Sequence, residues 1–386
     1  SNDLPDPENE QQAQDRLFFE PLVELVDIGG RENLFYKGFP IDVALLRGTT
    51  ADEAGNVTME REALTIDNLA QAMAVHNAGG VVIVQVERVA RAGTLPARDV
   101  HIPGILVDAI VVAKPENHVQ TYSTAFSQAF ANRIRPPAGE IPALPLDARK
   151  VIARRCVFEL PVNGVANLGI GMPEGVAAIA AEEGLLDHLT PTAKPGVIGG
   201  QPASGLDFGA AMNTHAVIPQ SNQFDFYDGG GVDQAFLGLA QSDVTGNINV
   251  SRFGSKIAGC GGFINITQNA KQVYFCGTFT AQGLAVEVDN QAVSIAQEGK
   301  QKKFTKQVEQ ITFSAAQALS NNKPVMYITE RAVFQLSPSG LELIEIAPGV
   351  DLDKEILQQM EFTPVISPSL KVMPNAIFQP SFELTL

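Results

Sequence analysis

Short apolar runs of strand length alternate along the chain with longer segments that have a helical pattern. The strand-like runs are residues 42–48, 80–86, 106–113, 164–171, 272–278 and 324–330. Helix-like segments between them include residues 66–80 and 173–189. Apolar strands separated by helices are what a mostly parallel sheet covered on both faces requires. The pattern therefore predicts an α/β fold.

A proline-rich segment interrupts this alternation. It contains Pro136, Pro137, Gly139, Pro142 and Pro145. Proline blocks the continuation of helices and strands. Directly after it, Asp147 can cap a helix whose apolar positions recur at helical spacing. We expect a first domain over residues 1–137, a linker over 138–146 and a second domain over 147–386.

The chain also contains an internal repeat. Residues 42–61 align without gaps on residues 233–252, with seven of twenty positions identical. The dipeptide Asn77-Ala78 before one apolar run likewise matches Asn269-Ala270 before another. Chance similarity is the alternative, because the shared positions are turn residues that common hairpins also favour. Duplication of one α/β unit predicts two similar domains.

The two copies differ in the length of chain that precedes the repeat. Eighty-six residues run from Asp147 to Val232, whereas 41 residues precede Asp42. We therefore expect the first domain to lack its N-terminal part. A complementary N-terminal segment, either missing or supplied by another chain, is the expected partner.

Composition narrows the class of protein. The 386 residues are 45% hydrophobic and 18% charged, which excludes wholesale disorder and gives room for two cores. No apolar run approaches the ~18 residues that a membrane helix needs. A net charge of −16 repels phosphate backbones and anionic membrane surfaces. We expect neither a nucleic acid nor a membrane as partner.

Cysteine and histidine usage bears on compartment and metals. Three cysteines are too few for a disulfide framework, which predicts a reducing, cytoplasmic location. The first twenty residues carry six acids and one arginine, the opposite of a signal or transit peptide. Five histidines are scattered without the spacing of metal ligands, so no metal site is predicted.

Glycine-dense loops are the candidate binding elements. Gly169 and Gly171 end a predicted strand just before a helix, as either an anion cradle or a tight turn without a ligand. Gly175 comes one residue late for a dinucleotide fingerprint, so a nicotinamide cofactor is not expected. The other loops are residues 196–200, Gly229 to Gly231, and Gly259, Gly261 and Gly262. Glycine lets backbone amides approach a ligand closely, and together these loops predict a site in the second domain.

Two further features allow two interpretations each. Cys260 lies between glycines and could be an activated thiol, but no partner base is evident and a small buried packing residue is the favoured interpretation. Lys300, Lys302 and Lys303 form either a solvated turn, which we favour, or a phosphate clamp.

Several motifs closely resemble family I CoA-transferases, in the propionate and acetate branch. They are VANLGIGMPEGVA, KPGVIGGQPASGLDFGAA, NQFDFYDGGGVDQAFL, GNINVSRFG, GCGGFINI, ITERAVF and LIEIAPGVDL. The resemblance extends from about Leu17 to Pro368. It implies two similar α/β domains, with chains that begin well before this one.

The resemblance implies an enzyme that moves CoA between a short-chain acyl-CoA and a carboxylate such as acetate. A glutamate attacks the acyl-CoA carbonyl, a mixed anhydride forms, and the released CoA thiolate converts it into a glutamyl-CoA thioester and free carboxylate. An incoming carboxylate then reverses these steps. CoA is a substrate in this scheme, and no tightly bound cofactor is expected.

The position of the family's glutamate is occupied here by Lys194. A lysine carries an ammonium at neutral pH, and as a free amine it would form a stable amide rather than an anhydride. Turnover by the family route should therefore fail. The alternative is a catalytically inactive acyl-CoA binding protein of the same fold. A third interpretation is a sugar-phosphate isomerase on a similar fold. That enzyme would need a carboxylate base and a basic phosphate pocket aligned with it, and the LIEIAPG and GVIGGQPASG motifs argue against it.

The resemblance also implies roles for the other candidates. Gly261 is the expected oxyanion donor beside position 194. CoA contacts are expected from Gly169, Gly171, Gly229, Gly230, Gly231, Gly259, Gly262, Asn265, Lys302 and Lys303. Glu330 and Glu345 lie in strand-like apolar runs and are expected to be structural. The assembly is expected to be a homo-oligomer.

Overall fold

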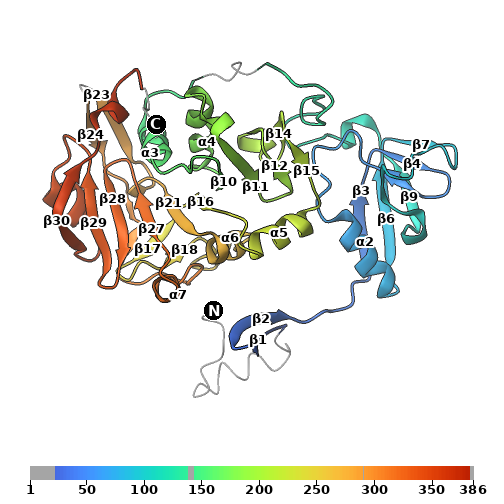
Figure 1. Cartoon of the computed structure of the whole chain (residues 1–386), viewed down its shortest axis with the longest axis horizontal. Helices are drawn as coiled ribbons and strands as arrows, with labels where there is room; N and C mark the ends of the chain where they lie inside the picture. Colours follow the sequence, from blue (N-terminus) through green and yellow to red (C-terminus); the bar gives the residue numbers. More distant parts are fainter. Residues whose placement is uncertain (1–21, 138–142, 290, 383–386) are drawn as a thin grey trace. The chain divides into compact units, whose positions relative to one another are not determined.

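The computed structural model describes residues 22–137, 143–289 and 291–382 (Figure 1). Contacts along the backbone divide the chain into unit 1, Ser1–Glu60 with Asn68–Pro115, and unit 2, Arg61–Asp67 with Glu116–Leu386. The predicted linker over residues 138–146 lies partly outside the described residues, and residues 116–137 group with unit 2. The domain boundary after residue 137 thus stays a prediction.

Unit 1 is built around a small parallel sheet. Its elements are β1 (Val23–Ile28), β2 (Arg31–Tyr36), β3 (Val43–Arg47), β4 (Thr50–Asp52), β5 (Val57–Thr58), α2 (Asn68–Asn77), β6 (Val81–Val86), β7 (Arg88–Ala90), β8 (Val100–Ile102) and β9 (Ala109–Val112). Strands β3, β6 and β9 are parallel in that order, and β7, β4, β5 and β8 form a second sheet.

The core of unit 1 follows from the alternation of side chains along its strands. Val82, Val84 and Val86 of β6 are fully buried, and Ala72 and Val75 of α2 belong to the same cluster. Side chains two residues apart on a strand share a face, so the valine run places three of them against the helix. The strands predicted at 42–48, 80–86 and 106–113 are confirmed by β3, β6 and β9.

Unit 2 contains a ten-stranded sheet. Its strands, in spatial order, are β15 (Ala216–Val217), β12 (Val197–Ile198), β11 (Leu189–Ala193), β10 (Gly164–Leu168), β16 (Gln234–Gly238), β21 (Gln272–Cys276), β27 (Val325–Ile328), β28 (Ala332–Ser337), β29 (Gly340–Ile346) and β30 (Val365–Val372). The five strands from β11 to β27 are parallel, as predicted. The neighbouring pairs β11–β12, β12–β15, β27–β28 and β28–β29 are antiparallel.

Helices cover both faces of this sheet, in agreement with the predicted α/β class. They are α3 (Ala148–Val157), α4 (Glu174–Glu182), α5 (Gln220–Asp228), α6 (Phe263–Asn269) and α7 (Ala315–Ser320). Figure 1 shows α3 and α4 on one side of the sheet and α5, α6 and α7 on the other. The Asp147 carboxylate accepts a hydrogen bond from the Lys150 amide, which confirms the predicted cap of α3.

Smaller strand pairs complete unit 2. They are β13 (Gln201–Pro202) with β14 (Ala211–Met212), β17 (Gln241–Asp243) with β18 (Ile248–Asn249) and β26 (Phe304–Thr305), β19 (Arg252–Phe253) with β20 (Lys256–Ile257), β22 (Thr280–Ala281) with β25 (Gln301–Lys302), and β23 (Ala285–Asp289) with β24 (Ala292–Gln297).

The predicted duplication is visible in both structure and hydrogen bonding. Strands β3, β4 and β5 have counterparts β16, β17 and β18 with identical lengths and spacing. Asp52 accepts hydrogen bonds from the Asn56 amide and side chain, and Asp243 accepts the same pair from Asn247. The two asparagines then each accept an amide at the start of a later helical segment, from Gly104 and from Ala315. One turn therefore organises both copies.

Two glutamates expected to be structural are held by arginines. Glu345 accepts two hydrogen bonds from Arg155, at 2.7 and 2.9 Å. The fully buried Glu330 accepts a 2.7 Å bond from Arg331. Paired guanidinium and carboxylate groups can be buried without leaving an unpaired charge. These contacts confirm the structural interpretation.

Candidate active site

A cavity of about 360 Å³ lies in unit 2 at the carboxyl ends of two central strands, β10 and β16. It is lined by Asn167, Leu168, Gly169, Ile170, Lys194, Phe208, Leu237, Gly238, Val250, Ala258, Gly259, Cys260, Gly261, Gly262, Phe263 and Ile266. Ligands of open α/β sheets bind at the carboxyl ends of the strands. The lining combines apolar walls with a glycine loop and a single charged side chain.

Lys194 is that charged side chain. It follows β11 directly, and Gly196 then turns the chain back into β12. Gly196 has a φ of +117°, and a Cβ there would lie 1.9 Å from the Ile218 carbonyl oxygen, so only glycine fits this turn. The turn directs Lys194, which is half-buried, into the cavity.

The Lys194 side chain lies against the glycine loop. A Cβ added to Gly262 would be 2.7 Å from Cδ of Lys194, and a Cβ on Gly261 would be 3.6 Å from its Nζ. The backbone of the loop can approach position 194 this closely because it lacks side chains. No acceptor meets the Gly261 and Gly262 amides within the described parts of the chain. These amides are therefore available to a developing negative charge.

A buried polar network supports the loop that carries Lys194. The hydroxyl of Tyr227 donates to Oγ1 of Thr192 at 3.0 Å and accepts from Gln223 and Asn167 at 2.8 and 3.0 Å. Tyr227 is fully buried, and burial raises the pKa of its hydroxyl, so it stays protonated. Thr192 is two residues before Lys194, and Asn167 lines the cavity. The network links both to α5.

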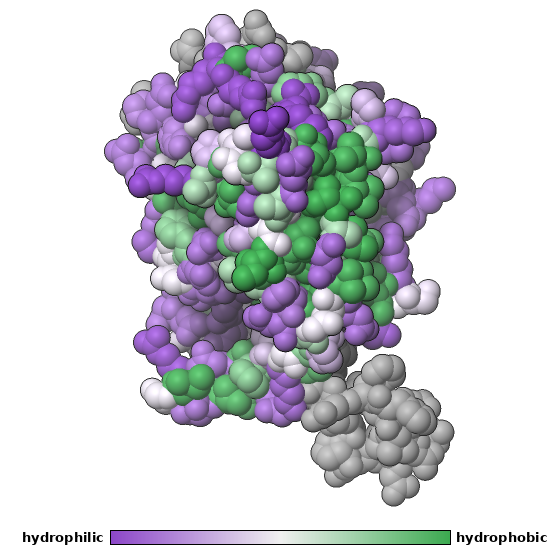
Figure 2. Space-filling model, turned by 90° about the vertical axis from the view of Figure 1, so that its right-hand side faces the viewer, coloured by the Kyte–Doolittle hydropathy of each residue, from purple (hydrophilic) through white to green (hydrophobic). Residues whose placement is uncertain are grey.

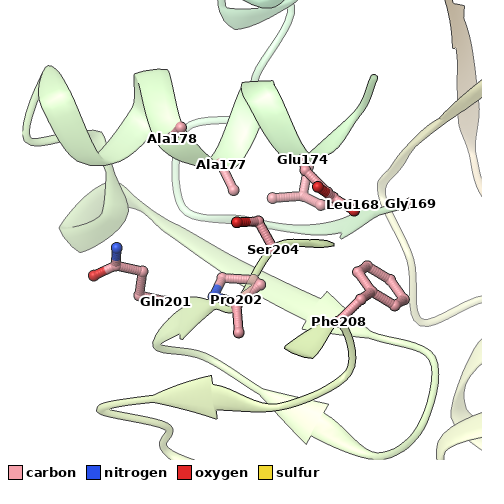
Figure 3. A pocket seen from close by; sticks show the side chains of 10 residues that line it. Leu168, Gly169, Glu174, Ala177, Ala178, Gln201, Pro202, Ser204 and Phe208 are labelled. Carbon is pink, nitrogen blue, oxygen red and sulfur yellow. The ribbon is translucent and has the colours of Figure 1, made fainter. Parts of the chain in front are cut away.

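A smaller pocket of about 70 Å³ adjoins the cavity (Figure 3). Its lining residues are Leu168, Gly169, Glu174, Ala177, Ala178, Gln201, Pro202, Ala203, Ser204 and Phe208. In Figure 3 the alanines project from α4 on one side, with Pro202 and Ser204 on the other and Phe208 near one end. Leu168, Gly169 and Phe208 line both spaces.

Glu174 organises the turn between β10 and α4. Its carboxylate accepts hydrogen bonds from the Gly171 amide at 2.9 Å and from Arg149 at 3.1 Å. The Gly169 amide donates to the Phe236 carbonyl at 2.9 Å. The amides of both glycines of the predicted anion cradle are thus satisfied within the chain, and a carboxylate of the chain occupies the helix start.

The structure brings five predicted residues together. Lys194, Gly169, Gly259, Gly261 and Gly262 all line the 360 Å³ cavity. They come from three separate stretches of sequence, and the parallel order of β10, β11 and β16 brings them to one edge of the sheet. Their catalytic and binding roles remain predictions.

The other predicted site residues do not line the cavity. Gly171 bonds to Glu174, and the amides of Gly229, Gly230 and Gly231 donate to carbonyls of α5. Asn265 donates to the Asp228 carboxylate. Lys302 donates to the Gln358 and Met360 carbonyls, and Lys303 to the Leu239 carbonyl and the Thr278 hydroxyl. Their CoA contacts stay predictions without support from these geometries.

Two interpretations of single features need correction. Cys260 is only half-buried and lines the cavity, because Gly259 and Gly261 hold it in the loop rather than in the core. Lys300 is exposed at a bend, as expected, but Lys302 lies in β25 and Lys302 and Lys303 are half-buried, so these two lysines are not part of a solvated turn. Burial lowers the pKa of the neighbouring Lys303 to about 8.

Sequence reasoning missed the apolar wall of the cavity. Phe208 and Val250 line it from two loops, and Phe263 and Ile266 line it from α6. Apolar residues in such positions have the same local pattern as core residues, so no signal in the sequence separated them. Asn167 could have been identified from the sequence, since a polar residue inside an apolar strand needs a hydrogen-bond partner.

Comparisons with known proteins indicate the family to which the chain belongs. A family model described as coenzyme A transferase matches residues 9–113. Caffeate CoA-transferase from Acetobacterium woodii is 48% identical over 98% of this chain and 73% of its own length. Acetate CoA-transferase YdiF from Escherichia coli K12 is 44% identical over 97% of this chain and 70% of its own length.

A solved structure shows the same fold. The crystal structure of the acyl-CoA transferase YdiF apoenzyme from E. coli O157:H7 superposes with a TM-score of 0.88 at 43% identity, covering 94% of this chain and 68% of that one. A second YdiF structure, described as a thioester complex with CoA, gives a TM-score of 0.86 at 42% identity, with the same coverage of both chains. These enzymes transfer CoA, and this chain belongs to the family I CoA-transferases.

The described residues also bear on metal binding and membrane insertion. In the part of the chain that the structure describes, no cluster of three or more histidine, cysteine, aspartate or glutamate side chains could hold a metal ion. None of the described helices is long and apolar enough to span a membrane.

Proposed function

We propose that the cavity at Lys194 binds a short-chain acyl-CoA and that the fold transfers CoA from it to a carboxylate such as acetate when position 194 is glutamate. The observation that supports this proposal is the contact between position 194 and the Gly261–Gly262 backbone. A nucleophile on one side of a thioester carbonyl and free amides on the other are the two elements of acyl transfer.

Lys194 changes what this particular chain does. An ammonium has no lone pair to attack the thioester, and a free amine would end in an amide that CoA thiolate does not reopen. The glutamyl-CoA thioester of the family route cannot form on this side chain. We infer that the chain binds acyl-CoA and turns it over negligibly, which is the behaviour of an acyl-CoA binding protein of the same fold.

Assembly and location complete the proposal. All three cysteines are free thiols, which supports a reducing, cytoplasmic compartment. The β subunit of an E. coli acetate CoA-transferase matches 54% of this chain at 32% identity, and its name describes it as a subunit of that protein. We propose that this chain also assembles, as a homo-oligomer or with a complementary segment.

Substitution of position 194 tests the proposed chemistry. Acetate-dependent exchange of CoA from propionyl-CoA is measured for the chain as given, for Lys194→Glu and for Lys194→Gln. Lys194→Gln removes the ammonium without supplying a carboxylate, so it is the matched control. We expect Lys194→Glu to exceed both by about a thousandfold or more, since loss of a covalent nucleophile costs at least that factor.

Intact-mass spectrometry after incubation with acetyl-CoA gives a second measurement. Lys194→Glu should gain the mass of bound CoA, and Lys194→Gln should not. Equal and substantial exchange by all three proteins would contradict the proposal, because the carboxylate would then be unnecessary.

A further inference from the structure

The small pocket of Figure 3 continues the cavity at Lys194. Leu168, Gly169 and Phe208 form a wall common to both spaces. Gly209, next to Phe208, packs against the residue that follows Lys194, since a Cβ on it would lie 3.3 Å from Cγ of Pro195. Phe208 therefore borders both the cavity that contains Lys194 and the small pocket.

The loop that carries Phe208 is anchored on both sides. The Asp207 carboxylate accepts hydrogen bonds from the hydroxyls of Thr121 and Thr124, the latter at 3.1 Å. Gly209 adopts a φ of +101°, a conformation that other residues rarely take. These two constraints fix the backbone on both sides of Phe208.

The chemistry of the pocket fits a short aliphatic chain. Seven of its ten lining residues are apolar side chains or glycine. The single charged residue, Glu174, already accepts bonds from Gly171, Gly205 and Arg149. One water molecule occupies about 10–15 Å³ of a cavity measured in this way. A pocket of about 70 Å³ therefore has room for a chain of a few carbon atoms but not for an aromatic ring.

We propose that this pocket holds the acyl chain of the thioester and that Phe208 and Ala177 set its length, with acetyl and propionyl accepted and longer chains excluded. The assignment rests on the proposed function. The glycine loop, which we propose contacts CoA, lines the cavity but not the small pocket. With CoA there, the acyl group extends from the carbonyl past Phe208 into the smaller space.

Ala177 closes the pocket from the helix side. It is 5% exposed, and Figure 3 shows its side chain directed toward Ser204 across the space. A leucine there fills the pocket, whereas alanine in place of Phe208 opens it into the larger cavity. The two substitutions thus change the available volume in opposite directions.

Calorimetry with acetyl-, propionyl- and hexanoyl-CoA tests the assignment on the chain as given and on Phe208→Ala and Ala177→Leu. The chain as given should bind propionyl-CoA about fourfold more tightly than acetyl-CoA, because burial of one additional methylene changes the affinity by about that factor. Its affinity for hexanoyl-CoA should be no higher than for acetyl-CoA. Phe208→Ala should raise the hexanoyl-to-acetyl affinity ratio about tenfold. Ala177→Leu should abolish the propionyl preference while retaining acetyl-CoA binding.

Leu206→Ala is the matched control, because Leu206 belongs to the same loop, is 65% exposed and lines neither space. It should leave all three affinities unchanged. Normal acetyl-CoA binding with unchanged chain-length ratios in both variants would overturn the pocket assignment and leave the proposed function standing. Failure of all three thioesters to bind any of these proteins would overturn both.

Discussion

Gly261 is a cavity residue whose backbone conformation favours glycine. Its φ of +53° lies in the left-handed region, and Nζ of Lys194 is 3.6 Å from where a Cβ would be. A β-branched side chain is strained in this conformation and would also enter the space beside position 194. Position 261 is therefore restricted to glycine, although it contributes only its backbone to the site.

We expect Gly261→Val to weaken CoA binding at least tenfold while the chain remains folded. Gly254→Val is the matched control, because Gly254 has a similar φ of +56° and nothing within 4 Å of its added Cβ. Calorimetry with CoA measures the affinity, and circular dichroism reports folding. Equal affinity of the two variants would show that the loop does not contact CoA.

At the scale of elements, the turn between β4 and β5 contributes to the free energy of unfolding of unit 1 through one buried carboxylate. The buried Asp52 carboxylate accepts bonds from the Ala54 and Asn56 amides, both at 3.0 Å, and from Gly93 at 3.3 Å. Burial works against the charged form, but these hydrogen bonds outweigh it and lower the pKa of Asp52 below its usual 3.8.

The sign of the pH dependence follows from that lowered pKa. The unfolded chain binds the proton more tightly, so the stabilisation is complete above 3.8 and is lost as the pH falls below it. We expect Asp52→Asn to lower the free energy of unfolding of unit 1 at pH 7 by about 2 kcal/mol and to flatten its acid dependence. Hydrogen exchange across residues 43–112 measures both quantities.

Asp99→Asn is the control for this substitution, since Asp99 is exposed in the same unit. It should change neither the stability at pH 7 nor the acid slope. An Asp52→Asn protein as stable as the original at pH 7 would show that the turn is held by its backbone bonds alone.

Local patterns predicted the elements whose partners are near in sequence. The alternation in β6, the Asp147 cap and the strands of the repeat all depend on neighbouring residues, and all three are present. Lys302 was placed in a solvated turn because its carbonyl partners, Gln358 and Met360, lie more than fifty residues away. The apolar runs around Glu330 and Glu345 indicated strands, but their antiparallel pairing as β28 and β29 was not predicted, because strand direction in a sheet depends on tertiary contacts.

At the scale of the whole molecule, the equivalent strands β3 of unit 1 and β16 of unit 2 differ in how far they are buried by neighbouring strands. β16 lies between β10 and β21, and its Phe236 is fully buried. β3 is an edge strand among the described residues, and its Leu45, the counterpart of Phe236, is 79% exposed. Figure 2 shows apolar side chains gathered in patches on the face that it draws.

We expect the isolated chain to bind an apolar dye and to self-associate through this edge. Unpaired strand edges with exposed apolar side chains favour association. Leu45→Asp should reduce both the dye fluorescence and the light scattering, whereas Ile105→Asp, at an 82% exposed position elsewhere in unit 1, should change them less. A monodisperse monomer without dye response would contradict this expectation.

The two copies also differ by one turn of helix. α2 has ten residues and ends at Asn77, while α6 has seven and ends at the matching Asn269. The first three residues of α2, Asn68–Ala70, correspond in the second copy to Cys260–Gly262, which precede α6 in an unwound loop. Unwinding exchanges a turn of helix for backbone amides that line the cavity. A helix-forming sequence in place of these three residues would extend α6 and remove the amides that we propose face the thioester.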